Sequence, residues 1–144
     1  MIGLVVTGHG LFAEGMHAAA RMIAGENGYI RYVCYSEDMQ PGELAIKLND
    51  AYNELAGCDG IVVLSDLPGG TPFKTAVECS LGHPGRQIIV LSGTNLPMLV
   101  SGSTMLGFET DPQALADRLL LDGRHSVVRF ELAVREEAAE EDGI

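Results

Sequence analysis

Short apolar runs that alternate with helical patterns constrain this chain more than any other feature of its sequence. The runs cover residues 2–6, 29–35, 60–66 and 87–92. Strands with no polar face are buried on both sides, as in parallel sheets that helices cover on each face. Because helical stretches join the runs, right-handed crossovers are expected. The predicted fold class is therefore α/β, with a mainly parallel sheet and helices on both faces.

Helical periodicity fills the stretches between these runs. Four apolar residues after the first run recur at steps of four, three and four: Phe12, Met16, Ala19 and Ile23. This spacing predicts that they face the core, with His17 on the opposite, polar face. A second stripe follows the second run: Leu44, Leu48, Ala51 and Leu55. Thr71-Pro72 and Asp111-Pro112 each pair a capping residue with proline, which predicts two helix starts.

Residues 126–132 are the one stretch with clean alternation of apolar and polar side chains. Its apolar positions are Val128, Phe130 and Leu132, with charged residues between them. Such alternation is typical of a strand with one solvated face, so an antiparallel or edge strand is expected after the last helix.

The charge balance narrows the classes of function. The 144 residues carry 9 Lys and Arg against 20 Asp and Glu, giving a net charge of −11. A protein that follows nucleic-acid phosphates needs a basic face, so no nucleic-acid partner is expected, whereas a partner with a basic surface fits. We expect one folded domain over residues 1–134 and a solvated acidic tail over residues 135–144.

The sequence lacks the marks of export and of membrane insertion. No apolar run reaches the roughly 18–20 residues of a membrane span, and the N-terminus lacks the basic start of a signal peptide. Cys34, Cys58 and Cys79 show no Cys-x-x-Cys spacing and are expected to be reduced, buried thiols, not a metal site or disulfides. A cytoplasmic protein is expected.

Glycine-rich polar turns follow three of the predicted strands, at residues 7–10, 66–71 and 92–95. In an open parallel sheet such turns meet at one edge, and helix N-termini there favour an anion. The edge is therefore expected to hold a phosphate, although no nucleotide-binding phosphate loop occurs. The expected phosphate-binding glycines are Gly10, Gly69 and Gly70.

A histidine stands at the centre of this edge. The imidazole of His9 is a good nucleophile near neutral pH, and its phosphoramidate is readily passed on. A carboxylate such as Asp66 can hold one ring nitrogen as N–H, which leaves the other lone pair free to attack phosphorus. From the residues alone, simpler interpretations stay open: His9 as a turn residue, Asp66 as a cap, and the glycine pair as tight backbone geometry.

Three sequence blocks resemble one known family. Residues 2–10, 66–73 and 93–99 resemble, in order and at the usual spacing, the signatures of IIA domains of the mannose family of bacterial phosphoenolpyruvate:sugar phosphotransferase systems. The resemblance covers roughly residues 1–132. It implies that His9 is phosphorylated, that Asp66 orients it and that the hydroxyl of Thr71 binds the phosphoryl group.

The resemblance also implies partners. The family accepts phosphate from phosphorylated HPr and passes it to a IIB subunit, which phosphorylates the sugar entering through the membrane IIC and IID components. No metal or nucleotide cofactor takes part. Members are homodimers that exchange the last strand, here residues 126–132, although a plain edge strand would give the same pattern.

Three other functions compete with this interpretation. One is a phosphotransfer subunit of a dihydroxyacetone kinase, and another is a non-PTS small-molecule enzyme or metal chelatase with a Gly-His-Gly turn. The third is a module that senses phosphate-bearing metabolites. The remaining histidines, His17, His83 and His125, are expected to lie away from the phosphate site, and the sequence does not specify the sugar.

Overall fold

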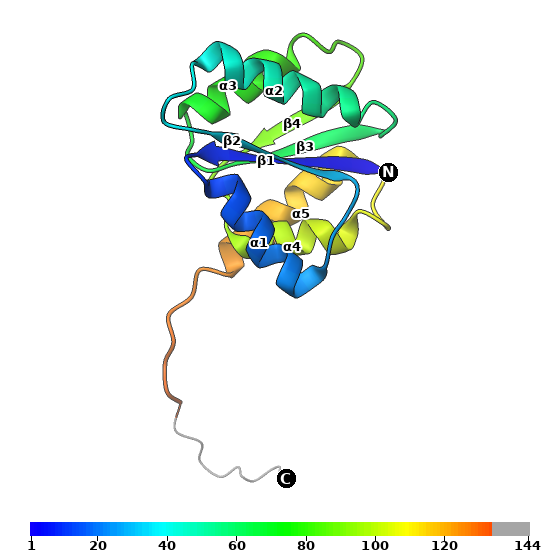
Figure 1. The fold of residues 1–144 in the computed structure, drawn as a ribbon. Coiled ribbons are helices and arrows are strands. Elements are labelled where there is room, and N and C mark those ends of the chain that lie inside the picture. The colour runs from blue at the N-terminus through cyan, green and yellow to red at the C-terminus, as the bar shows by residue number, and fades with distance from the viewer. Residues whose placement is uncertain (134–144) are drawn as a thin grey trace.

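The computed structural model describes residues 1–133, of which residues 2–125 form three layers (Figure 1). In chain order the elements are β1 (Ile2–His9), α1 (Phe12–Ala24), β2 (Ile30–Tyr35), α2 (Pro41–Glu54), β3 (Gly60–Ser65), α3 (Thr71–Ser80), β4 (Gln87–Leu91), α4 (Leu96–Met105) and α5 (Pro112–His125). The predicted α/β class is confirmed.

The sheet is parallel throughout, with strand order β2-β1-β3-β4. In the central strand β1 every residue except His9 is buried, and β3 is buried along its whole length. The chain runs from β1 to β2 on one side and later to β3 on the other. The carboxyl ends of β1 and β3 therefore flank the point where the strand order reverses, which is where open α/β sheets bind ligands.

Helices cover both faces of the sheet (Figure 1). The side chains of Leu4 and Val6 pack in a core with α1, α4 and α5, whereas Val5 packs in a second core with α2 and α3. This alternation along β1 explains why its sequence has no polar face, since each side of the strand is buried against a helical layer.

The predicted core face of α1 is right for Phe12 and Met16, which pack against the core, and wrong for Ile23, which is 61% exposed. The fully buried residues of the helix are Ala13 and Ala20. His17, expected on the polar face, is half-buried and stacks on Tyr32 of β2, with ring centroids 4.0 Å apart. Small residues face the sheet because α1 packs against β1, β2 and α4 together. In α2 the predicted stripe is buried as expected.

One of the two predicted helix starts is displaced. The Asp111 carboxylate accepts a hydrogen bond from the amide of Gln113 at 3.1 Å and caps α5, as expected. The cap of α3, however, is Gly70, and Thr71 is the first helical residue. Among residues 1–133 the Thr71 hydroxyl makes no hydrogen bond, so it is left for another partner.

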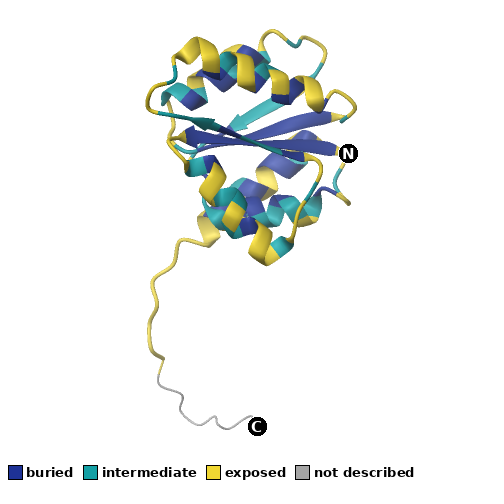
Figure 2. Cartoon of the chain, viewed as in Figure 1, coloured by how far each residue is buried: buried dark blue, intermediate teal, exposed yellow. Residues whose placement is uncertain are grey.

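Residues 126–133 extend from the end of α5 without pairing to any strand of residues 1–133 (Figure 2). The predicted strand at 126–132 is thus absent from this single chain, and Val128, Phe130 and Leu132 are 81%, 83% and 84% exposed. The reason is physical: the segment leaves the body of the protein, and within residues 1–133 nothing covers its apolar side. The expected tail, residues 135–144, lies outside the described residues.

Two further expectations concern membrane insertion and the cysteines. Among residues 1–133 no helix has the length and apolar character needed to cross a membrane. All three cysteines are free thiols, but only Cys79 is buried; Cys34 and Cys58 are partly exposed, contrary to expectation. Burial raises the pKa of both Cys58 and Cys79, which disfavours their reactive thiolate forms.

Candidate functional site: a histidine–aspartate pair at the sheet edge

The carboxyl ends of β1 and β3 bring His9 and Asp66 together. The Nδ1 atom of His9 lies 2.8 Å from Oδ2 of Asp66, the contact that the sequence predicts. Because a carboxylate only accepts, Nδ1 carries the hydrogen, and in the neutral ring the lone pair of Nε2 is free. The side chain of His9 is 45% exposed and that of Asp66 is 14% exposed. The imidazole of His9 is thus an oriented nucleophile that faces solvent, and the more buried carboxylate of Asp66 holds it in place.

The carboxylate of Asp66 is fixed by backbone as well as by the imidazole. The amide of His9 donates to Oδ2 at 2.8 Å, and the amide of Leu67 donates to Oδ1 at 2.8 Å. Burial by itself raises the pKa of Asp66, but the hydrogen bonds from His9 and Leu67 outweigh it, so the pKa lies below its ordinary value. Asp66 therefore stays ionised and can hold the tautomer of His9.

A tight turn after Asp66 leaves room for the imidazole. The amide of Gly70 donates to the carbonyl of Leu67 at 3.2 Å, and Gly69 has φ +77°, which fits a type II turn with Pro68 before it. A Cβ atom on Gly70 would lie 2.9 Å from Cε1 of His9. Only glycine at position 70 lets the turn pack directly against the ring.

Hydrogen-bond donors for an anion come from the start of α3, but not from every predicted glycine. The amide of Gly10 donates to the carbonyl of Tyr35 at 2.7 Å, and that of Gly70 is used in the turn. Within residues 1–133 the amides of Gly69, Thr71 and Phe73 and the hydroxyl of Thr71 have no such partner. These donors, with the positive end of the α3 dipole, form the side of the site toward β3.

The third glycine-rich turn supports the site without presenting donors to it. The amide of Gly93 donates to the carbonyl of Asp66 at 3.0 Å. Thr94 donates twice to the carbonyl of Ser65, from its amide at 3.1 Å and from its hydroxyl at 2.6 Å. The turns do meet at one edge as predicted, but this one fixes the backbone that carries Asp66.

Two site residues escaped the sequence analysis. Tyr35 ends β2 beside His9, with ring centroids 6.0 Å apart and planes at 66°. Gly8 has no room for a side chain, because a Cβ atom would lie 2.5 Å from the ring of Phe12 and 2.9 Å from Cγ of Asp66. The signal for Tyr35 was its place at the carboxyl end of the strand next to β1.

The remaining histidines make contacts away from this pair. His17 Nε2 lies 2.9 Å from Glu26 Oε1, and His83 Nε2 lies 3.0 Å from Asn49 Oδ1. His125 is the exposed last residue of α5. Of the four histidines, only His9 lies at the switch point of the sheet.

Comparison with known proteins identifies the class to which this fold and histidine–carboxylate pair belong. The family model EIIA-man, described as PTS system fructose IIA component, matches residues 3–119. The chain belongs to this family, the mannose/fructose IIA components of the bacterial sugar phosphotransferase system, and is a component of that system.

Individual members of this family are similar to much of the chain. Over 115 residues it is 34% identical to the mannose-specific EIIAB component of Escherichia coli K12, covering 77% of this chain and 33% of that protein. The chain thus spans about a third of that relative's length. The fructose-specific EIIA component of Bacillus subtilis is 27% identical over 100 residues, covering 69% of this chain and 67% of that protein.

Solved structures agree with the fold. An EIIA component from Streptococcus agalactiae superposes with a TM-score of 0.83 at 28% identity, covering 90% of this chain and 98% of the other. A mannose/sorbose-specific IIA subunit from Enterococcus faecalis gives a TM-score of 0.79 at 28% identity, covering 92% and 97%.

Proposed function

We propose that this chain carries a phosphoryl group on Nε2 of His9, taken from phosphorylated HPr and passed to a IIB subunit. The observation that supports this most is the 2.8 Å contact between His9 Nδ1 and Asp66, which leaves the Nε2 lone pair free on a half-exposed ring. As in other oriented histidines, the carboxylate fixes the tautomer and offsets positive charge on the ring during transfer.

The transfer step balances without a cofactor. The Nε2 lone pair forms the new N–P bond while the bond between phosphorus and the donor's histidine nitrogen breaks, and that nitrogen keeps the electron pair. The proton on Nδ1 stays between His9 and Asp66. Transfer to the IIB histidine is the same exchange in reverse, so the protein mainly supplies positioning and electrostatic stabilisation.

The phosphoryl oxygens take the free donors at the start of α3. These are the amides of Gly69, Thr71 and Phe73 and the hydroxyl of Thr71. Hydrogen bonds to a charged group are about twice as strong as neutral ones, and the helix N-terminus adds favourable potential. Of the glycines predicted to bind phosphate, Gly69 retains this role, whereas Gly70 provides clearance for the ring.

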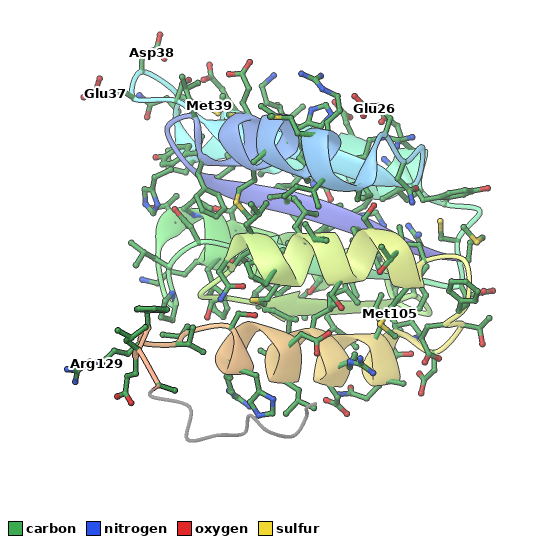
Figure 3. All side chains as sticks on the ribbon, turned by 90° about the horizontal axis from the view of Figure 1, so that it is seen from below. Glu26, Glu37, Asp38, Met39, Met105 and Arg129 are labelled. Atoms are coloured by element: carbon green, nitrogen blue, oxygen red, sulfur yellow. The ribbon has the colours of Figure 1, made fainter. Side chains whose placement is uncertain are left out.

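The surface around His9 fits a docking protein with a basic, partly apolar face. Leu11 and Leu67, next to the site, are 68% and 57% exposed. Glu37 and Asp38 project into solvent from the loop that follows β2 (Figure 3). HPr and IIB would dock here in turn, linking the protein indirectly to the membrane IIC and IID components and placing it in the cytoplasm.

Labelling from phosphoenolpyruvate tests the carrier function. With enzyme I and HPr present, the chain should acquire an acid-labile, base-stable phosphoryl group. His9→Ala should abolish the label, while alanine at His17, His83 or His125 should leave it in place. Full labelling of the His9→Ala protein would refute the assignment.

A second stage of this assay tests the acceptor. The labelled protein, freed of HPr, is mixed with a purified mannose-family IIB subunit, and loss of label from one protein should match its gain by the other. A chain that is labelled but transfers to no IIB subunit would instead fit the dihydroxyacetone-kinase interpretation.

We also propose a homodimer that exchanges residues 126–132. Among residues 1–133 the outer edge of β4 is unpaired, and beside it lies a hollow of about 520 Å³ with apolar walls that include Val90, Leu91 and Leu120. The exposed apolar side of 126–132 matches such a surface, and an open strand edge favours pairing with another chain.

Light scattering coupled to size exclusion measures the mass. A dimer is expected, and replacing Val128 and Phe130 together by Asp should yield a folded monomer. A concentration-independent monomer for the unaltered protein would contradict the exchange.

A further inference from the structure

A tyrosine stands on the side of His9 that lies opposite the glycine-rich turn. Tyr35 is the register partner of His9 in the β1–β2 ladder, so both side chains project from the same face of the sheet. Their ring centroids are 6.0 Å apart and the ring planes meet at 66°, an edge-on arrangement. The phenol therefore flanks the imidazole from the side of β2.

The backbone holds Tyr35 firmly in this position. Its carbonyl accepts the amide of Gly10 at 2.7 Å, which extends the pairing of β1 and β2 by one bridge beyond His9. The half-buried ring packs against the core under α2 that contains Val33 and Leu44. The ring is thus anchored, and its position relative to His9 does not depend on a flexible loop.

The hydroxyl of Tyr35, in contrast, is uncommitted. Throughout residues 1–133 it makes no hydrogen bond, whereas the other tyrosine of the same core, Tyr52, donates to the carbonyl of Ala76 at 3.0 Å. The oxygen of Tyr35 is not one of the buried polar atoms that lack a partner, so it is open to solvent and can donate to a group that arrives beside the imidazole.

The distribution of the other donors leaves a place for this hydroxyl. The amides at the start of α3 and the hydroxyl of Thr71 all belong to the turn that follows β3, on one side of the ring. A phosphoryl group on Nε2 carries three outer oxygens around phosphorus, and donors from a single side do not surround them. Tyr35 is the aromatic residue with a donor on the other side.

We propose that the hydroxyl of Tyr35 donates a hydrogen bond to an outer oxygen of the phosphoryl group on His9 Nε2. The inference rests on the proposed function, since it needs His9 to be phosphorylated. The bond places a neutral donor on a charged acceptor, which stabilises the phosphorylated state and helps to orient phosphorus for transfer. Tyr35 is in this sense a further catalytic residue.

The test is Tyr35→Phe, which removes one oxygen and keeps the ring. Tyr29→Phe is the matched control, because Tyr29 is an exposed tyrosine just before β2, at the other end of the sheet. The proteins are phosphorylated with phosphoenolpyruvate, enzyme I and HPr. Three quantities are measured: the transfer rate in quench-flow, the lifetime of the isolated phosphoprotein, and the ³¹P chemical shift of its phosphohistidine.

For Tyr35→Phe we expect transfer to be about tenfold slower, because one hydrogen bond to a charged group is lost. We also expect the phosphoprotein to have a shorter lifetime and its ³¹P resonance to be displaced. The Tyr29→Phe protein should match the wild type in all three. If Tyr35→Phe also matches the wild type, the hydroxyl has no such role, even if Tyr35→Leu then shows that the ring matters. Failure of the wild-type protein to be labelled on His9 would instead overturn the proposed function.

Discussion

Two glycine-rich turns at the same edge of the sheet differ in what they do with their polar groups. The turn after β3, residues 66–71, leaves the hydroxyl of Thr71 and two amides without partners among residues 1–133. The turn after β4, residues 92–95, uses its groups inward: Gly93 donates to the carbonyl of Asp66, Thr94 donates to that of Ser65 at the end of β3, and Asn95 caps α4.

This difference separates a binding turn from a supporting one. Similar composition and similar position at the edge do not give the same role, because a donor that is already bonded cannot bind a ligand without losing that bond. The turn after β4 supports the turn after β3, and the turn after β3 holds Asp66 against His9. Substitutions in the turn after β3 should therefore affect transfer, and substitutions in the turn after β4 should affect mainly stability.

Asp66→Asn should have the largest effect on transfer. The amide keeps the size of the carboxylate but loses its charge, and it can select the wrong tautomer of His9. We expect transfer from phospho-HPr to slow by roughly two orders of magnitude or more, by analogy with other oriented histidines. Quench-flow rates measured beside the melting temperature check this. A folded Asp66→Asn protein with the wild-type rate would remove Asp66 from the mechanism.

Thr71→Val should come next. Valine has the shape of threonine but no hydroxyl, and among residues 1–133 the hydroxyl makes no bond that folding would lose. Transfer should fall roughly tenfold to a hundredfold, as expected for one donor to a charged group. The melting temperature should stay within about a degree of the wild type, since no cap is removed. Loss of stability in parallel with loss of transfer would mean that Thr71 is structural.

Thr94→Val is the counterpart in the supporting turn. It removes the 2.6 Å bond to the carbonyl of Ser65 but leaves the amide bond to the same carbonyl in place. We expect the free energy of unfolding to fall by about 1 kcal/mol, while transfer changes by less than about threefold. Urea denaturation and quench-flow on the same preparation measure both. A large loss of transfer at unchanged stability would erase the distinction between the two turns.

The sequence was sufficient for the parts of this site that depend on strand ends. The apolar runs at residues 2–6 and 60–66 predicted buried strands, and the topology of parallel sheets then brought His9 and Asp66 to one edge. The hydrogen bond between them followed from the chemistry of a carboxylate beside an imidazole.

The sequence was not sufficient where the result depends on which donors are already bonded. Nothing in a Gly-Gly-Thr-Pro pattern shows that the amide of Gly70 closes a turn, or that Thr71 begins the helix instead of capping it. The contact of Tyr35 with His9 arises from pairing between β1 and β2, a long-range feature. The strand at 126–132 is a further case, since its pairing partner is not in the same chain if the exchange occurs.

The smallest expected effect is the pH dependence of stability that Asp66 contributes. Its pKa in the folded protein lies below the ordinary value of 3.8, because the hydrogen bonds from His9 and Leu67 outweigh the effect of burial. A group with a lowered folded pKa stabilises the protein fully above its unfolded pKa, and this contribution is lost as the pH falls through the folded value. The difference in unfolding free energy between the wild type and Asp66→Asn should therefore be constant near neutral pH and shrink as the pH drops below about 4. Urea denaturation of both proteins at a series of pH values measures this difference. If it stays constant or grows on acidification, the carboxylate is not held by these donors in solution, and the binding turn would lack the fixed anchor that distinguishes it from the supporting one.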